Sequence, residues 1–198
     1  QSYFPWHCTF LNDANAGAFA EGIGSDLPSS FFYLSLSNTV GGAIFHDGNL
    51  LPGDAFRCGE AGHMTLIPDG KPCYCGKTGC VDAYCSARVL SDLSGGRLED
   101  FFLGLQQNNR EYRPVWDTYL KHLAVVINNL HMILDYDIVL GGYVGSFLTP
   151  WLDTIRHLVS ERNTFEDDGS FVKLCTYQTG AAAYGAAMDV MEGFLRTV

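Results

Sequence analysis

Hydrophobic and polar residues along this chain follow two periodicities, one typical of strands and one typical of helices. Residues 31–51 show the strand pattern, and His46-Asp47-Gly48-Asn49 within them is a turn of the Asp-Gly type that closes β-hairpins. Between Val115 and Leu134, apolar side chains recur every three or four residues, which predicts a long amphipathic helix. That helix could serve the core or an interface between subunits equally well.

Shorter segments complete an alternation of strands and helices. Helix-forming residues after Asn12-Asp13 predict a capped helix over 14–22 that begins near residue 13. The other expected elements are a strand-like piece at 63–67 inside a connector at 53–80, a helix at 81–90, a buried strand at 137–142, a helix at 148–159, an extended segment at 172–175 and a helix at 181–194. This order predicts an α/β layered fold, and no repeat or linker divides residues 1–198 into separate domains.

The composition is that of a folded protein that does not itself bind nucleic acid. With 47% hydrophobic and 13% aromatic residues, the 198 residues can bury one substantial core. The 12 Lys and Arg against 22 Asp and Glu give a formal charge of −10, which repels a phosphate backbone, and no basic run offsets it. The longest uncharged stretch, 27–45, contains Pro, Ser and Gly, so no membrane-spanning helix is expected. Because the first residue is Gln1 rather than Met, we expect a fragment whose missing part carries some of the function.

Seven cysteines are present, and three of them fall within eight residues. An odd number of cysteines with three of them clustered suits a metal site in reducing cytosol better than a disulfide framework. We therefore expect a cytoplasmic protein. His63, Cys73, Cys75 and Cys80 offer one imidazole and three thiolates, a closed tetrahedral set that predicts structural zinc. The alternative, that cysteines are small buried hydrophobes, fits the remaining ones: Cys8, Cys58, Cys85 and Cys175. It fits the cluster poorly because Lys and Gly surround it, and a disulfide between Cys73 and Cys75 would be strained.

Five short motifs occur in the order found in the ROK family of sugar kinases and sugar-responsive transcriptional repressors. They are Asn-Asp-Ala-Asn at 12–15, Val-Gly-Gly-Ala-Ile at 40–44, Gly-Glu-Ala-Gly-His at 59–63, Cys-Tyr-Cys-Gly-Lys-Thr-Gly-Cys at 73–80 and Val-Leu-Gly-Gly at 139–142. The chain therefore resembles the C-terminal lobe of ROK proteins over nearly its whole length. The resemblance implies a ribonuclease-H-like lobe of the actin-like ATPase superfamily, with a zinc loop at about 59–82, in proteins that often form homo-oligomers. It places outside this chain an N-terminal lobe with an Asp-x-Gly-Gly-Thr phosphate loop, and any domain that binds DNA.

The resemblance also implies a sugar-binding site. Asp13 matches the family's catalytic base, and Asn12 beside it offers an amide to sugar hydroxyls. Glu60 and His63 match the sugar-binding pair, in which the histidine gives one ring nitrogen to zinc and presents the other to the ligand. Asp82 stands where the family usually has Glu, so its side chain is one methylene shorter. Without the resemblance, Asp13 and Asp82 are explained as helix caps and Glu60 as a solvated loop carboxylate.

Two turns match the nucleotide-binding turns of ROK kinases, at Asn38, Thr39, Gly41, Gly141 and Gly142. The first departs from the Gly-Thr-Gly-x-Gly-Gly pattern, because Ser37 and Thr39 replace glycines that let backbone amides approach phosphates. The second is followed by Tyr143, a bulky residue that we expect to fill or reshape a nucleotide pocket. Without the resemblance, both are ordinary turns at strand ends. These departures count against an efficient kinase.

Three functions follow from these observations. The preferred one is the sugar-binding effector lobe of a ROK transcriptional regulator, which needs no ATP. The alternative is the C-terminal lobe of a sugar kinase that uses magnesium-ATP and Asp13 to phosphorylate a hexose or an N-acetylhexosamine. The third is a zinc-stabilised structural or dimerisation module, against which the polar residues Asn12, Asp13, Glu60 and His63 argue.

Overall fold

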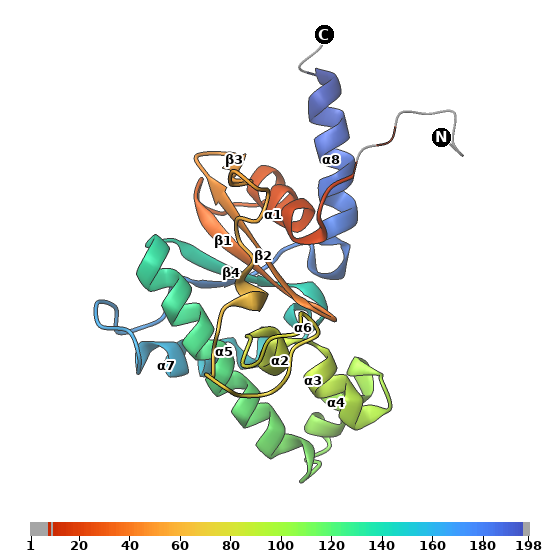
Figure 1. Ribbon diagram of the computed structural model, residues 1–198, viewed down its shortest axis with the longest axis vertical. Helices are drawn as coiled ribbons and strands as arrows, with labels where there is room; N and C mark the ends of the chain where they lie inside the picture. Colours follow the sequence, from red (N-terminus) through yellow and green to blue (C-terminus); the bar gives the residue numbers. More distant parts are fainter. Residues whose placement is uncertain (1–7, 9, 196–198) are drawn as a thin grey trace.

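A mixed five-stranded sheet lies at the centre of the computed structural model, which describes Cys8 and residues 10–195 (Figure 1). The strands are β1 (Phe31–Leu36), β2 (Val40–His46), β3 (Asn49–Leu50), β4 (Asp137–Gly141) and β5 (Val172–Leu174). Their spatial order is β3-β2-β1-β4-β5, in which β1 pairs antiparallel with β2 and parallel with β4. β5 extends the parallel part beside β4. The predicted α/β class is confirmed.

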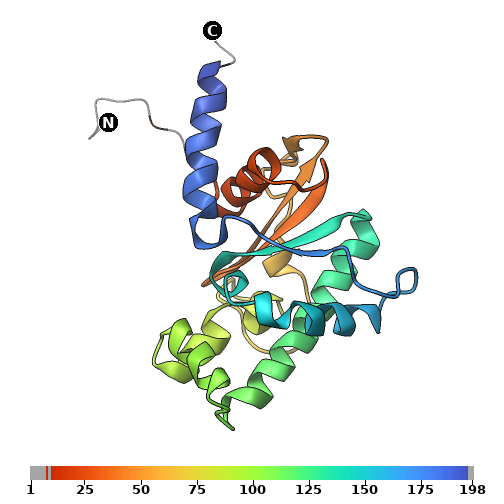
Figure 2. The same ribbon diagram turned by 180° about the vertical axis from the view of Figure 1, so that it is seen from behind.

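Helices cover both faces of the sheet (Figures 1 and 2). They are α1 (Asp13–Gly24), α2 (Asp82–Cys85), α3 (Arg88–Ser91), α4 (Leu98–Gln106), α5 (Tyr112–Leu134), α6 (Gly142–Gly145), α7 (Leu152–Ser160) and α8 (Ala181–Leu195). Single 3₁₀ turns lie at Ala61–His63, Asp92–Ser94, Thr149–Trp151 and Gln178–Gly180. α1 packs on one face, with α8 against α1, and α5 and α7 pack on the other face. No helix in the described part of the chain is long and apolar enough to span a bilayer.

The central strand β1 is buried along its whole length because helices cover both of its faces. Phe31 and Tyr33 belong to the core cluster on the α1 side, whereas Phe32 and Leu34 belong to the cluster on the α5 side. Fully burying an aromatic or aliphatic side chain contributes about 1.5–3 kcal/mol. A strand buried on both faces has no polar side, which explains the nearly continuous hydrophobic run of β1.

α1 and α8 approach each other closely because small residues line their contact. Ala16 and Ala20 of α1 are fully buried, and Gly185 of α8 lies directly against the backbone of Ala16. The fully buried Glu21 adds a polar connection, since its Oε1 accepts the backbone N–H groups of Thr176 and Tyr177 at 2.8 and 2.9 Å. α1 is thereby fixed to the segment that leads into α8.

Several predicted elements differ from the observed ones. Residues 31–51 form three strands rather than one hairpin, because a second turn at 37–39 separates β1 from β2. The predicted helix at 81–90 is broken at the extended Ser86, after which the Ala87 N–H donates to the Ser37 carbonyl at 2.7 Å. The expected strand at 63–67 is only an isolated bridge from Thr65 to Cys80, and α4 was not predicted. The helix expected at 148–159 begins later, because a 3₁₀ turn with a proline precedes α7.

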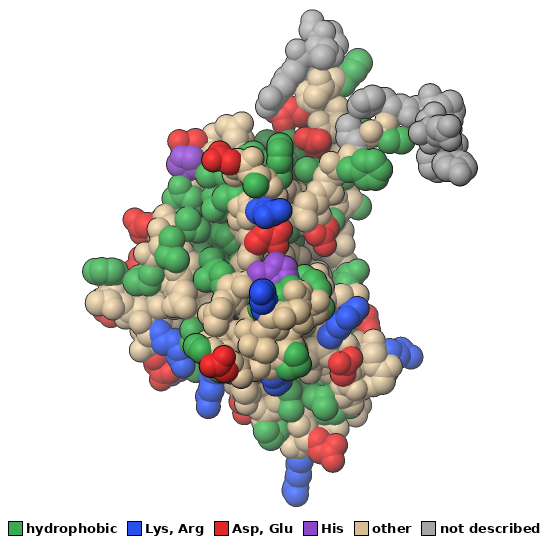
Figure 3. Space-filling view, in the orientation of Figure 1, with side chains coloured by type: hydrophobic (Ala, Val, Ile, Leu, Met, Phe, Trp, Pro, Cys, Tyr) green, Lys and Arg blue, Asp and Glu red, His purple; other side chains and the backbone are tan. Residues whose placement is uncertain are grey.

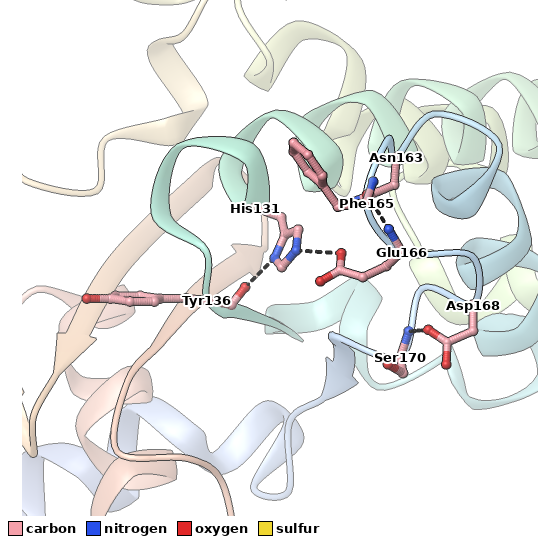
Figure 4. Close-up of polar contacts among 7 residues, drawn as sticks. All are labelled: His131, Tyr136, Asn163, Phe165, Glu166, Asp168 and Ser170. Atoms are coloured by element: carbon pink, nitrogen blue, oxygen red, sulfur yellow. Dashed lines mark hydrogen bonds and ion pairs between the residues drawn. The ribbon is translucent and has the colours of Figure 1, made fainter.

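A buried histidine near the end of α5 connects three segments (Figure 4). His131 is 5% exposed, and its ring stacks on Phe171 with the two ring centroids 3.6 Å apart. Its Nδ1 lies 2.8 Å from the Tyr136 carbonyl oxygen, and its Nε2 lies 2.8 Å from Glu166 Oε2. Because a carbonyl oxygen only accepts, Nδ1 is the donor in the first contact. The contact with Glu166 attaches the loop between α7 and β5 to α5.

Replacing Glu166 by alanine is expected to lower the free energy of unfolding by about 1–3 kcal/mol, because a buried ring nitrogen loses its partner. Glu161→Ala is the matched control. It removes a carboxylate 3.5 Å from the exposed His157, and this exposed pair is expected to contribute less than about 1 kcal/mol. Urea unfolding followed by circular dichroism measures both changes. Equal losses in the two variants would show that the contact with His131 does not stabilise the fold.

Candidate functional site

The first residues of β2 bring two distant segments of the predicted site together. A Cβ atom placed on Gly41 would stand 3.2 Å from Ala14 Cβ, so the start of α1 packs directly on this strand. Gly62 lies against the backbone and side chain of Val40, which holds the loop 59–63 at the same place. Larger residues at either glycine would separate the segments. The glycines of these motifs thus serve close packing between backbones.

Asn12 and Asp13 lie together at the N-terminus of α1, as predicted. Asn12 is the capping residue, and its Oδ1 accepts the N–H groups of Ala14 and Asn15 at 2.9 and 3.2 Å. Asp13 Oδ1 also accepts the Ala14 N–H at 2.9 Å. Both side chains are exposed, and a helix N-terminus is a favourable place for negative charge. The capping role belongs mainly to Asn12, which leaves the Asp13 carboxylate open to a ligand.

The four predicted metal ligands converge. One donor atom from each of His63, Cys73, Cys75 and Cys80 lies within 4.8 Å of all the others, and the sulfur atoms of Cys75 and Cys80 are 3.7 Å apart. A turn positions them, since the Cys73 N–H donates to the Lys77 carbonyl at 2.8 Å. The Lys77 N–H in turn lowers the pKa of Cys75, whereas burial raises the pKa of Cys80 to about 12. One imidazole and three thiols at this spacing fit a tetrahedral metal ion, whose charge would hold all three as thiolates.

Tyr74, which the sequence analysis did not single out, lies beside the sugar-binding candidates. Its Oη is 3.3 Å from His63 Nε2, and the two rings meet edge to face with centroids 5.5 Å apart. Partial burial and then the Asp82 carboxylate raise the pKa of Tyr74, and Glu60 contributes in the same direction. Tyr74 therefore lies against His63, and the charges of Asp82 and Glu60 act on its hydroxyl group. The only sequence signal for Tyr74 was its position between two predicted metal ligands.

Asp82 has a structural contact that its sequence position did not reveal. It is 7% exposed, and its Oδ1 accepts the Val40 N–H at 2.6 Å. The alternative explanation as a helix cap is wrong, because α2 has no hydrogen bond from a side chain to its N-terminus. Asp82 instead joins the start of α2 to the start of β2.

The two predicted nucleotide turns are also adjacent. Gly142 has a φ of +75°, and a Cβ atom there would stand 2.6 Å from the Leu36 nitrogen and 2.7 Å from Ser37 Oγ. Only glycine allows the end of β4 to approach the turn between β1 and β2 this closely. Gly41, in contrast, faces α1, so packing on Ala14 accounts for its lack of a side chain.

Two hollows flank the turn at 37–39. The first, of about 280 Å³, is lined by residues that include Tyr143, Phe147 and Thr179, so Tyr143 forms a wall and does not fill the space. The second, of about 460 Å³, lies between this turn and the 59–82 loop, and Tyr74 and Asp82 line it. Asn38 lines both. Asn12, Asp13, Glu60 and His63 line neither hollow and lie on the exposed surface instead.

Charged side chains of both signs are distributed over the face that carries the 59–82 loop (Figure 3). Lys71 and Arg88 line the second hollow together with the carboxylates of Asp82 and Asp92. Among the described residues on this face, the basic side chains do not gather into one patch. The hollow therefore offers donors and acceptors of mixed charge, which suits a small ligand with many hydroxyl groups.

Comparison with known proteins agrees with this arrangement. The ROK family model matches residues 1–192. An N-acetylmannosamine kinase from Salmonella typhi is 30% identical over an alignment of 188 residues, and the match covers 90% of this chain and 62% of the relative. A ROK family glucokinase from Streptomyces griseus, solved in complex with glucose and AMPPNP, matches with a TM-score of 0.75 at 23% identity, over 89% of this chain and 66% of that one. A ROK family transcriptional regulator, homologous to the E. coli MLC protein, matches with a TM-score of 0.69 at 22% identity, over 89% and 50%.

These matches define the fold and show how much of each relative the chain covers. The mixed sheet and its helices have the same fold as the Streptomyces griseus glucokinase. The chain spans 62% of the length of the Salmonella kinase. Because the family model covers nearly all of the sequence and the motifs come together in space, the chain belongs to the ROK family.

Proposed function

We propose that this chain is the C-terminal lobe of a cytoplasmic, ATP-dependent sugar kinase that acts on a hexose or an N-acetylhexosamine. The observation that carries the proposal is that the start of α1, which bears Asp13, and the loop 59–63, which bears Glu60 and His63, both pack on the first residues of β2. A phosphoryl transfer to a sugar needs a base and hydroxyl-binding groups that are held close together, and β2 provides that arrangement for these residues. The relatives that are N-acetylmannosamine kinases favour the same function.

The sequence alone favoured a regulator, and two of its reasons lose weight. Tyr143 leaves an open hollow beside it. Ser37 and Thr39 do carry side chains in the turn between β1 and β2. The adjacent Gly142 nevertheless lets the backbone at the end of β4 come close to this turn. The similarity to a ROK regulator is one of fold, and it covers half of that protein. The kinase is therefore the better proposal.

Each candidate residue has a role in this function. Asp13 would take the proton from the sugar hydroxyl that attacks the γ-phosphate of ATP, and Asn12, Glu60, His63 and Asp82 would bind the other hydroxyls. Asn38, Thr39 and the Gly141–Gly142 turn would face the nucleotide, with magnesium supplied together with ATP. The base and the sugar ligands come from α1 and from the 59–63 loop, which β2 holds together.

We infer that the metal held by His63, Cys73, Cys75 and Cys80 is zinc, and that its role is structural. The donor set leaves no ligand position for a catalytic water, since three sulfurs and one nitrogen complete a tetrahedron. The metal would fix the loop that carries Glu60 and His63. The chain would thus form one lobe with its zinc loop at about 59–82.

A coupled assay on the intact protein tests the proposed function. We expect ATP consumption that depends on the sugar, when N-acetylmannosamine, N-acetylglucosamine, mannose and glucose are supplied one at a time. Samples without sugar measure the background of ATP hydrolysis. Binding of a sugar without any turnover would reject the kinase and return the effector lobe of a regulator as the better function.

A further inference from the structure

Tyr74 is an exposed aromatic residue in a loop that does not need an aromatic side chain there. The chain turns at 73–77 through two backbone hydrogen bonds, from the Cys73 N–H to the Lys77 carbonyl at 2.8 Å and from the Gly76 N–H to the Cys73 carbonyl at 3.0 Å. Neither bond involves the side chain at position 74, which is 65% exposed. Packing therefore does not explain a large apolar ring at this position.

The surroundings of Tyr74 are polar groups that recognise hydroxyls. Tyr74 lines the hollow of about 460 Å³ that Asn38 and Asp82 also line. Its Oη lies 3.3 Å from His63 Nε2, and the two rings meet edge to face. The phenol thus stands between the hollow and the predicted sugar-binding pair.

The chemistry of a tyrosine suits a sugar in this position. A pyranose has apolar faces of C–H groups and a rim of hydroxyls, and tyrosine has an apolar ring with one polar tip. A sugar lying on the ring would cover apolar surface that is now in contact with water. A sugar hydroxyl could then replace the phenol as the partner of His63, so that the ring nitrogen keeps a hydrogen bond throughout.

We propose that Tyr74 is a further sugar-contacting residue. Its ring forms a wall of the sugar site, and its hydroxyl is hydrogen-bonded to His63 Nε2 until a sugar hydroxyl replaces it. The proposal rests on the proposed function, because it takes a sugar as the ligand. Tyr74 would also contribute to sugar specificity. Its ring would contact one face of the pyranose, so substituents that project from that face would change the affinity.

Two substitutions of Tyr74 in the intact protein test this role. Tyr74→Ala removes the wall and is expected to weaken binding of the preferred sugar, measured by calorimetry, about tenfold. Tyr74→Phe keeps the ring and is expected to stay within about threefold of the unchanged protein. Lys77→Ala is the matched control, because Lys77 is an exposed residue of the same turn that contributes through its backbone. In a turnover assay the loss in Tyr74→Ala is expected in KM, with kcat within about threefold.

The possible failures are distinguishable. If the unchanged protein binds a sugar and Tyr74→Ala binds it as well as Lys77→Ala does, the inference is wrong while the proposed function stands. If both Tyr74 variants lose metal and bind sugar equally weakly, Tyr74 only supports the loop, and the inference is also overturned. If the unchanged protein binds none of the four sugars, the proposed function itself fails. Metal analysis and thermal unfolding of every variant separate these cases.

Discussion

Replacing Asp13 by asparagine in the intact protein is expected to lower kcat for sugar phosphorylation by about 10²–10⁴-fold, the usual contribution of a general base. Asparagine has the same shape and can still accept the Ala14 N–H through its Oδ1, but it cannot take a proton from a hydroxyl. The cap of α1 is unaffected, because Asn12 makes it. The loss should therefore occur in kcat, with unchanged thermal stability and little change in sugar affinity.

Asp168→Asn is the matched control for this experiment. Its carboxylate also accepts a nearby backbone N–H, from Ser170 at 2.9 Å, and it lies in the loop before β5 (Figure 4). That variant should phosphorylate sugar at the rate of the unchanged protein. If Asp13→Asn kept more than about a tenth of kcat, a general base worth at least 10²-fold would be excluded at this position.

Removing the metal is expected to have the second large effect. We expect about one zinc ion per chain, and we expect Cys80→Ser to lose it and to lower the free energy of unfolding by about 3 kcal/mol or more, since metal binding at a structural site stabilises the folded state directly. Cys80 is 2% exposed, and the neighbouring Val81 N–H donates to the Met64 carbonyl at 2.9 Å. Loss of the ion would therefore loosen both sides of the loop and move His63. Sugar affinity should fall together with stability.

Cys58→Ser provides the comparison, because Cys58 is only partly buried and is not among the converging ligands. It should bind metal normally and change stability by less than about 1 kcal/mol. Metal analysis by atomic emission and urea unfolding with and without a strong chelator measure these effects. An absence of zinc, or unchanged stability after chelation, would contradict the structural metal.

The sequence predicted those features that depend on local patterns. The helix over α1, its N-terminus at Asp13, the long helix α5 and the strand β4 all follow from periodicity and capping residues that act within a few positions. The donor atoms of the four predicted metal ligands do come together, because the short spacing within 73–80 limits how far the sulfurs can separate. The identity of the ion and the roles of the sugar-site residues stay predictions.

Other features depend on contacts between residues far apart in the chain. The break between α2 and α3 follows from a hydrogen bond to Ser37, and the burial of Asp82 follows from its bond to Val40, 42 positions away. No local pattern encodes such bonds, since either partner alone is an ordinary turn or helix residue. The same holds for Tyr74, which becomes a candidate only where the loop places it against His63 and the hollow.

The sequence by itself thus determined the α/β class, the family motifs and the set of candidate metal donors, because each depends on residues that lie close to one another along the chain. Only the tertiary structure decided that β2 holds Asp13 and the 59–63 loop together, that Asn38 lines two hollows and that Tyr143 leaves one of them open. These features depend on how elements that are distant in the sequence pack against one another. Glycines allow that close packing, but the sequence does not show which segments lie next to each glycine.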